Sequence, residues 1–182
     1  MGQTVPSAGD TLSGGTFGAG WRRASSNQPM SLKQHDAAPD FEVRDDQGNP
    51  FRLSNLKGKA VVLYFYPKAD TPGCTKEACS FRDTLAEFTE LGAVVIGVSP
   101  DEPSAQAKFK AKYELTFPLL ADADHAVAEA YGVWKEKHNY GKTYMGVERT
   151  TFILAKDGTI ARIFPKVKVD GHSEEVLAAL RG

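Results

Sequence analysis

The run AVVLYFYP at residues 60–67 constrains the fold of this chain more than any other segment. Its β-branched and aromatic residues follow one another without polar alternation, and the run ends at Pro67. This pattern is typical of a strand that is buried on both faces, so the strand should lie centrally in a sheet. Both faces of such a sheet need apolar cover, which favours an α/β protein with flanking helices.

The rest of the chain alternates between strand-like and helix-like patterns. Residues 74–92 place apolar side chains three or four positions apart and stop at Gly92, which predicts one amphipathic helix. Further strands are predicted at 93–100, 117–122, 149–155 and 159–165, and further helices at 104–115, 125–133 and 173–181. The last two strands flank a Lys-Asp-Gly turn, so the central sheet should be mixed, with an antiparallel edge.

The chain of 182 residues is long enough for one hydrophobic core and too short for two ordinary domains. We therefore expect a single domain over residues 30–182, which starts with an N-terminal β-hairpin around the turn DQGN at 46–49. Residues 1–29 are rich in Gly and Ser and show no hydrophobic periodicity, so they should be disordered. We interpret them as an upstream extension before Met30, although Arg22, Arg23 and several serines also fit a transit peptide.

The charge and the cysteine content argue against several classes of protein. With 22 basic and 23 acidic side chains and no dense basic run, the chain lacks the positive surface that binds nucleic acids. A membrane partner is not expected either. Two cysteines in a chain that can bury its own core do not make the disulfide framework of a small secreted protein, which favours a reducing, cytoplasmic location.

The two cysteines, Cys74 and Cys79, follow the central strand and a Thr-Pro-Gly turn. Cys74 falls at the start of the predicted helix, where free N–H groups and the helix dipole stabilise a thiolate. The ordinary alternative for a cysteine is a small buried hydrophobic residue. That alternative fits Cys74 poorly because of its position on a turn, and it fits Cys79 better because that residue lies within the helix.

A metal site is a weaker interpretation of the same residues. Four residues separate the cysteines, which matches no usual zinc spacing. The histidines are scattered along the chain, at His35, His125, His138 and His172. We therefore expect neither a metal ion nor a cofactor.

The segment PKADTPGCT at 67–75 fits the Pro-x-x-x-Thr-x-x-Cys loop of peroxiredoxins. The longer segments TPGCTKEACSFRD and YGVWKEKHNYGKTYMGVERTTFIL resemble the PrxQ/bacterioferritin comigratory protein subfamily. The resemblance extends from about residue 31 to the C-terminus. It implies a thioredoxin-like fold and a thiol-dependent peroxidase that reduces hydrogen peroxide and organic hydroperoxides in antioxidant defence.

The resemblance also implies roles for particular residues. Cys74 matches the peroxidatic position, Thr71 and Pro67 match the peroxide-binding loop, and Arg149 matches an arginine from a distant strand. Cys79 matches the resolving position, where a thiol condenses with the sulfenic acid to a disulfide, which thioredoxin or a similar dithiol reductant then reduces. A hydroxyl and a guanidinium suit this chemistry, because they can orient a peroxide and meet the charge on its departing oxygen. The family pattern favours a monomer.

Simpler interpretations exist for three polar residues. Thr71 can cap the helix, Arg149 can form a surface ion pair, and Glu77 reads first as an acidic residue in the first turn of the helix. The main rival function is a thioredoxin-type disulfide oxidoreductase, whose C-x-x-C motif does not match the spacing here. A second rival is a redox switch or holdase, which peroxide turnover with thioredoxin, its reductase and NADPH would distinguish from an enzyme.

Overall fold

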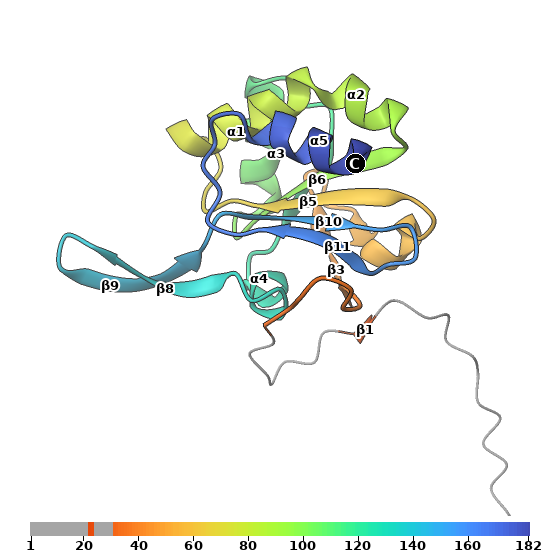
Figure 1. Cartoon of the computed structure of the whole chain (residues 1–182). Helices are drawn as coiled ribbons and strands as arrows, with labels where there is room; N and C mark the ends of the chain where they lie inside the picture. The colour runs from red at the N-terminus through yellow and green to blue at the C-terminus, as the bar shows by residue number, and fades with distance from the viewer. Residues whose placement is uncertain (1–21, 24–30) are drawn as a thin grey trace, which may run out of the picture.

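A mixed seven-stranded sheet runs through the centre of the computed structural model, which describes Arg22–Arg23 and residues 31–182 (Figure 1). Its strand order is β11-β10-β5-β6-β7-β3-β4. The strands are β3 (Glu42–Asp45), β4 (Pro50–Arg52), β5 (Ala60–Phe65), β6 (Ala93–Ser99), β7 (Leu119–Ala121), β10 (Thr150–Leu154) and β11 (Ile160–Phe164). The disorder predicted for 1–29 lies outside the described residues, except at the short strand β1 (Arg22–Arg23), which pairs with β2 (Pro39–Asp40).

The predicted central strand is confirmed as β5. It pairs in parallel with β6 and antiparallel with β10, so Val62 lies between Val95 and Ile153. The residues from Val61 to Phe65 are completely buried. The predicted antiparallel edge is confirmed by β10 and β11, and the N-terminal hairpin of β3 and β4 forms a second antiparallel edge.

Alternate residues of β5 face two separate hydrophobic cores. One core, with Val62 and Tyr64, contains residues of the helices α1 (Pro72–Asp83), α2 (Leu85–Glu90), α3 (Pro103–Lys112) and α5 (His172–Arg181). The other core, with Leu63 and Phe65, contains residues of α4 (Ala126–Ala130) and the short 3-10 helix η1 (Leu53–Leu56). Figure 1 shows α1, α2 and α5 above the sheet and α4 below it, which confirms flanking helices on both faces. Among the described residues, no helix is both long enough and apolar enough to cross a membrane.

One helix prediction is wrong, because residues 74–92 belong to two helices rather than one. α1 already begins at Pro72, in the first helical position that proline favours, and it ends before Thr84. Thr84 directs both its backbone N–H (3.2 Å) and its hydroxyl (2.8 Å) to the carbonyl oxygen of Ser80. This back-bonding favours the end of a helix over its continuation. The apolar spacing continues across the break and therefore does not reveal it.

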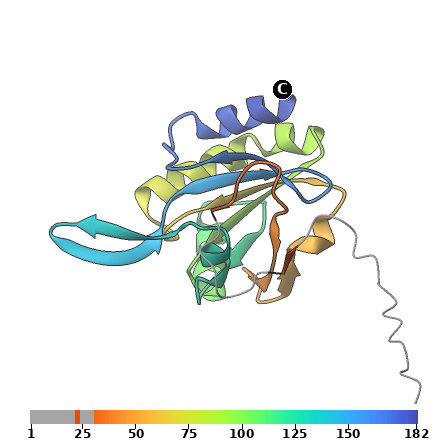
Figure 2. The same ribbon diagram turned by 60° about the horizontal axis from the view of Figure 1, so that its bottom comes forward.

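A second hairpin, formed by β8 (Trp134–Asn139) and β9 (Lys142–Val147), projects from the body of the protein (Figures 1 and 2). The sequence patterns do not predict it. Most of its side chains are exposed, so no buried face imposes an alternation of apolar and polar residues. Its turn residues Tyr140 and Gly141 have φ angles of 49° and 75°, as in the tight turns that match the twist of paired strands. β9 leads through Glu148 and Arg149 directly into β10.

Candidate active site

The end of β5 and the start of α1 place Cys74 at the centre of the candidate site. The chain leaves the sheet after Phe65 and enters α1 at Pro72, which makes Cys74 the third residue of the helix. The N–H groups of a first helical turn have no partners within the helix, and they favour an anionic sulfur beside them. Cys74 is a free thiol with 2% of its surface exposed.

Strand pairing brings Arg149 to this thiol across 75 positions of sequence. Thr150 pairs with Phe65 in the antiparallel ladder of β10 and β5, so the residue before Thr150 lies beside the chain that leaves β5. The Nη2 group of Arg149 donates a hydrogen bond of 3.2 Å to Cys74 Sγ. The predicted pairing of these two residues in one site is therefore present in the geometry.

Gly73 leaves space for the guanidinium next to the start of the helix. A Cβ atom at this position would lie 3.3 Å from Arg149 Nη2, which is closer than an ordinary van der Waals contact. Glycine therefore lets Arg149 approach the helix and reach Cys74 without displacement.

Glu77 belongs to the site, and its interpretation as a first-turn acidic residue is wrong. Its side chain is 1% exposed, and its Oε1 accepts a hydrogen bond of 3.0 Å from Arg149 Nη1. Burial raises the pKa of Glu77 to about 7, and the nearby Arg149 guanidinium only partly offsets this effect. The signal that could have revealed Glu77 is its spacing of three from Cys74, which places both side chains on one side of a helix.

The same contacts bear on the simpler interpretation of Arg149, which is a surface ion pair. The guanidinium does form an ion pair, but only 17% of its side chain is exposed, so this is not the surface pair of the simpler interpretation. Arg149 instead bridges two buried groups, the thiol of Cys74 and the carboxyl group of Glu77. The Arg149 side chain thus links the start of β10 to two residues of α1, Cys74 and Glu77, that lie one helical turn apart.

Thr71 and Pro67 lie in the loop between β5 and α1. Thr71 is the N-cap residue of α1 by its backbone, but its side chain makes no capping hydrogen bond. Its hydroxyl instead donates a hydrogen bond of 2.8 Å to the carbonyl oxygen of Lys68. Because the hydroxyl proton is used there, Thr71 Oγ1 can act toward a ligand only as an acceptor. Pro67 is half-buried at the start of the loop.

Contacts from two neighbouring elements hold this loop in place. The N–H of Ala69 donates a hydrogen bond of 2.8 Å to Oδ2 of Asp101, which lies just beyond β6. Asp70 accepts hydrogen bonds from Lys112 (2.9 Å) and from the hydroxyl of Tyr113 (2.8 Å), at the end of α3. The loop is therefore positioned before any ligand binds.

Cys79 lies farther along α1, half-buried and also free. Residues five apart in an α-helix are about 7.5 Å apart along the axis and roughly 140° apart around it, which gives a Cα separation of about 8–9 Å. A disulfide requires about 4.4–6.8 Å between Cα atoms. The intact helix therefore keeps the two thiols from bonding.

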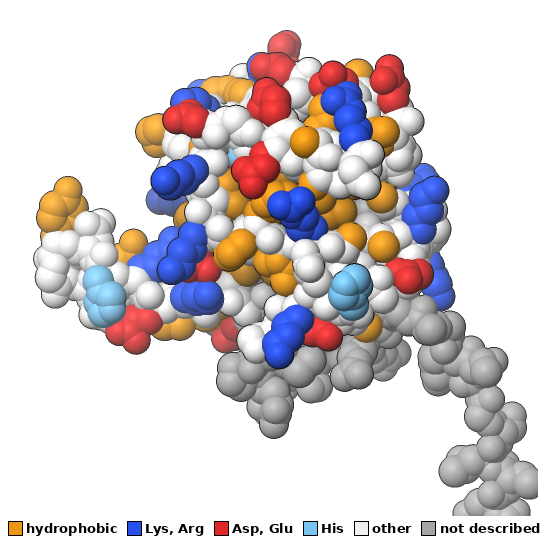
Figure 3. Space-filling view, in the orientation of Figure 1, with side chains coloured by type: hydrophobic (Ala, Val, Ile, Leu, Met, Phe, Trp, Pro, Cys, Tyr) orange, Lys and Arg blue, Asp and Glu red, His pale blue; other side chains and the backbone are white. Residues whose placement is uncertain are grey.

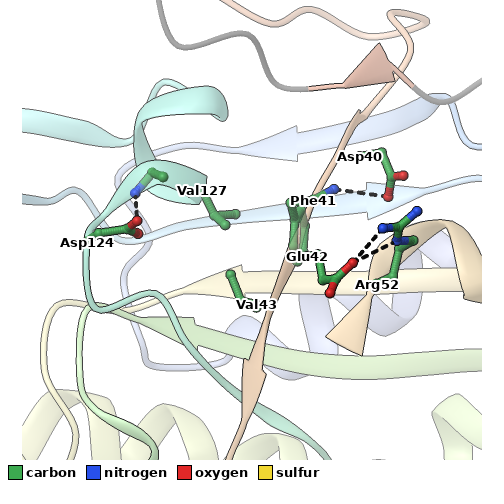
Figure 4. Close-up of a pocket in the computed structure, with 8 residues that line it drawn as sticks. Asp40, Phe41, Glu42, Val43, Arg52, Asp124 and Val127 are labelled. Carbon is green, nitrogen blue, oxygen red and sulfur yellow. Dashed lines mark hydrogen bonds and ion pairs between the residues drawn. The ribbon is translucent and has the colours of Figure 1, made fainter. Parts of the chain in front are cut away.

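Cavities elsewhere on the surface do not include these residues. A cavity of about 360 Å³ lies between β3, β4 and α4 (Figure 4), and another of about 410 Å³ is lined by Lys135, Glu148 and Thr150 among others. In the first cavity the polar groups already have partners, such as the ion pair of Arg52 and Glu42. Within residues 31–182, no group of three or more His, Cys, Asp or Glu residues is placed to hold a metal ion.

Comparison with known families identifies the class of protein. The family model described as "AhpC/TSA family" matches residues 35–163. "Putative peroxiredoxin bcp" of Coxiella burnetii is 51% identical over 151 residues, which cover 83% of this chain and all of that protein. "Peroxiredoxin Bcp" of Bacillus subtilis is 51% identical over 152 residues, which cover 84% of this chain and 97% of that protein.

Solved structures agree with this result. The bacterioferritin comigratory protein of Xanthomonas campestris, studied for alkyl peroxide reduction, has a TM-score of 0.74 and 42% identity, and the match covers 78% of this chain and 90% of that one. A cysteine mutant of Xylella fastidiosa PrxQ has a TM-score of 0.79 and 35% identity, with coverage of 84% and 97%.

The chain therefore belongs to the AhpC/TSA family and, within it, to the Bcp/peroxiredoxin Q subfamily. It is a thiol peroxidase, with peroxides as substrates and a thiol reductant for turnover. The predicted fold class and enzyme class are both confirmed. The roles of the individual residues stay predictions.

Proposed function

We propose that Cys74 is the peroxidatic residue, that Cys79 resolves its oxidised form, and that thioredoxin or a similar dithiol protein completes the cycle. The observation that carries this proposal is the hydrogen bond of 3.2 Å from Arg149 to the buried sulfur of Cys74 at the start of α1. Helix start and guanidinium act together on one thiol, and both favour its reactive thiolate form.

The first chemical step forms a bond between sulfur and oxygen. The thiolate of Cys74 attacks the terminal oxygen of the hydroperoxide, the O–O bond breaks, and the departing alkoxide or hydroxide takes up a proton. Cys74 is then a sulfenic acid. Hydrogen peroxide and organic hydroperoxides both supply this O–O bond, and alkyl peroxide reduction by the Xanthomonas relative supports the inclusion of organic substrates.

Arg149 and Thr71 suit the two needs of this step. The Thr71 oxygen can accept a hydrogen bond from the O–H of the hydroperoxide, because its own proton is donated to Lys68. The Arg149 guanidinium supplies fixed N–H groups for the negative charge on the departing oxygen. Pro67 begins the loop that carries Thr71.

The second step requires α1 to open. The thiol of Cys79 attacks the sulfenic sulfur of Cys74, a disulfide forms, and water leaves. Since the intact helix separates the two Cα atoms, its first turns must unwind. Farther along α1, Ala78 and Phe81 are completely buried and Ser80 bonds Ser173 of α5, so we expect the opening to stop near these residues.

Reduction of the disulfide by an external dithiol then restores the helix. Two electrons and two protons pass from the dithiol to Cys74 and Cys79 through a mixed disulfide. The short sequence separation keeps the resolving thiol at high local concentration, while the helix delays its attack.

We also propose that the protein acts as a monomer. The large hydrophobic residues that the described part of the chain exposes are Leu91, Tyr140, Tyr144 and Met145. Three of them lie on the narrow hairpin of β8 and β9, which does not offer the broad apolar face of an obligate dimer. Light scattering across a concentration series tests this. The cytoplasmic location stays a prediction.

A pair of cysteine variants tests the proposed function. With thioredoxin, thioredoxin reductase and NADPH, we expect Cys74→Ser to consume no peroxide, because a serine hydroxyl is a far poorer nucleophile. Cys79→Ser should still reduce about one equivalent of peroxide per protein before it stalls, since the first step needs only Cys74. Substantial turnover by Cys74→Ser, or no reaction at all with Cys79→Ser, would refute the two assignments.

A further inference from the structure

The register of the projecting hairpin separates its charges onto two faces. Lys135 pairs with Gly146, and Lys137 pairs with Tyr144. Paired and alternate residues of a two-stranded ribbon share a face. One face therefore carries Lys135, Lys137, Asn139, Lys142, Tyr144 and Gly146, without any acidic residue of the two strands. Figure 3 shows Lys and Arg side chains gathered where the hairpin joins the body.

Lys137 differs from its neighbours on β8. It is half-buried, whereas Glu136 and His138 on either side are exposed. Its stem lies over Gly146, since a Cβ atom at Gly146 would be 3.4 Å from Lys137 Cδ and 3.6 Å from Cε. Gly146 is two residues nearer the base of the hairpin than Tyr144, the strand partner of Lys137. The lysine therefore leans toward the base, where the chain continues to Arg149.

The ammonium group of Lys137 is also unusual in its charge environment. Lys135 forms an ion pair of 2.9 Å with Glu148, but within the described part of the chain no carboxylate lies within 4.0 Å of Lys137. Burial lowers the pKa of Lys137, Arg149 acts in the same direction, and the negative charges of Cys74 and Glu148 oppose both. A half-buried lysine without a carboxylate partner among the described residues thus leans toward the end of the sheet where Arg149 contacts Cys74.

A second positive charge near Cys74 would stabilise the ionised form of the site. Arg149 donates to both Cys74 and Glu77, so one positive charge serves a carboxyl group and a thiol that reacts as its thiolate. When both are ionised, the cluster of three side chains carries one uncompensated negative charge. A second cation nearby would balance this charge and favour the thiolate.

We propose that Lys137 is this second cation, with a side chain that leans from the middle of β8 toward the base of the hairpin and stabilises the Cys74 thiolate. The inference rests on the proposed function of Cys74. Within the described residues no hydrogen bond joins Lys137 to the sulfur. Lys137 therefore acts through its charge alone, which attracts the negative charge of the thiolate without contact. Figures 1 and 2 place the base of the hairpin at the same end of the sheet as the start of α1.

Other titratable groups facing the thiol must be separated from this effect. Tyr64 and Tyr66 face Cys74 from the end of β5, and burial raises the pKa of each tyrosine far above neutral pH, so both stay uncharged. Glu77 titrates near neutral pH, with a pKa of about 7. Arg149 stays charged throughout.

The test measures the rate of iodoacetamide alkylation of Cys74 against pH, in a Cys79→Ser background so that a single thiol reacts. We expect Lys137→Gln to move the midpoint of this profile upward by about 0.5–1 pH unit, the scale for a charge roughly 10 Å away at an effective dielectric constant of about 25–50. Lys137→Arg should restore the parent profile, because it keeps the charge. Lys142→Gln removes a lysine from the same face near the turn and should leave the midpoint unchanged.

The outcomes separate this inference from the proposed function. Gly146→Val is a second variant. A Cβ atom there would make only an ordinary contact of 3.4 Å with Lys137 Cδ, but the two methyl groups beyond it would crowd the lysine stem, so we expect the midpoint to shift although the lysine is present. If Lys137→Gln and Gly146→Val both match the parent, the inference is overturned. If Cys74→Ser keeps peroxide turnover, the proposed function fails instead, whatever the alkylation profiles show.

Discussion

The buried carboxyl group of Glu77 makes the stability of the folded protein depend on pH in a direction that can be worked out. Its pKa is about 7 in the folded protein against an ordinary value of 4.5, because burial outweighs the attraction of Arg149. Below pH 4.5, Glu77 is protonated in both states and costs nothing. Between pH 4.5 and 7 the unfolded chain loses the proton while the folded protein keeps it, so the free energy of unfolding falls as the pH rises.

The size of the effect follows from the same shift. A difference of about 2.5 pH units, at 1.36 kcal/mol per unit, corresponds to about 3 kcal/mol of stability lost by pH 8 relative to pH 4.5. Glu77→Gln keeps an oxygen acceptor for Arg149 Nη1 but cannot ionise. We therefore expect the variant to match the parent near pH 4.5 and to be more stable by up to about 3 kcal/mol near pH 8.

Urea unfolding of the reduced proteins at half-unit pH intervals measures this difference. Asp122, whose pKa burial raises to about 6, and His172, whose pKa burial lowers, titrate in both proteins and cancel in the comparison. Curves of unfolding free energy that run parallel for parent and variant from pH 4.5 to 8 would show that Glu77 is ionised without cost. Burial of Glu77 would then not outweigh the attraction of Arg149.

Three further expectations concern the rate of reaction with peroxide and the unwinding of α1. Arg149→Ala should lower the second-order rate with hydrogen peroxide by roughly 10²-fold or more in stopped-flow measurements, and an unchanged rate would make Arg149 purely structural. Gly73→Val should slow the same reaction by about tenfold or more, because its side chain displaces the Arg149 Nη2 group from the sulfur, whereas equal rates would show that the guanidinium has room to move. Amide hydrogen exchange across residues 74–83 should lose protection in the first turns of α1 when the disulfide forms and keep it near Phe81, and equal protection in both redox states would refute the unwinding.

The elements with a buried face were predictable from the sequence, and those without one were not. β5 is completely buried from Val61 to Phe65, so its apolar run directly reports its place in the sheet. The hairpin of β8 and β9 buries little of its surface, so its strands show no regular alternation of apolar and polar residues. Its one local signal is the Tyr140–Gly141 turn. The break at Thr84 depends on a side-chain hydrogen bond to Ser80 that apolar spacing does not record.

The site shows the same limit in another form. Local sequence was enough to place Cys74 at a helix start after a buried strand, because strand, turn and helix are consecutive. The approach of Arg149 depends on the pairing of β10 with β5, so only the family resemblance pointed to it. Glu77 was misjudged because a charged residue near the start of a helix is usually exposed, whereas here the guanidinium accompanies it into the interior.

Peroxide should oxidise Cys74, and Cys79 should then form a disulfide with it. The most direct measurement is mass spectrometry of the protein after one equivalent of hydrogen peroxide, with dimedone present to trap sulfenic acid. We expect a Cys74–Cys79 disulfide within each chain in the parent and a dimedone adduct on Cys74 in Cys79→Ser. A dimedone adduct on Cys79 in Cys74→Ser, or a parent protein whose two thiols stay unlinked after reaction, would contradict this expectation.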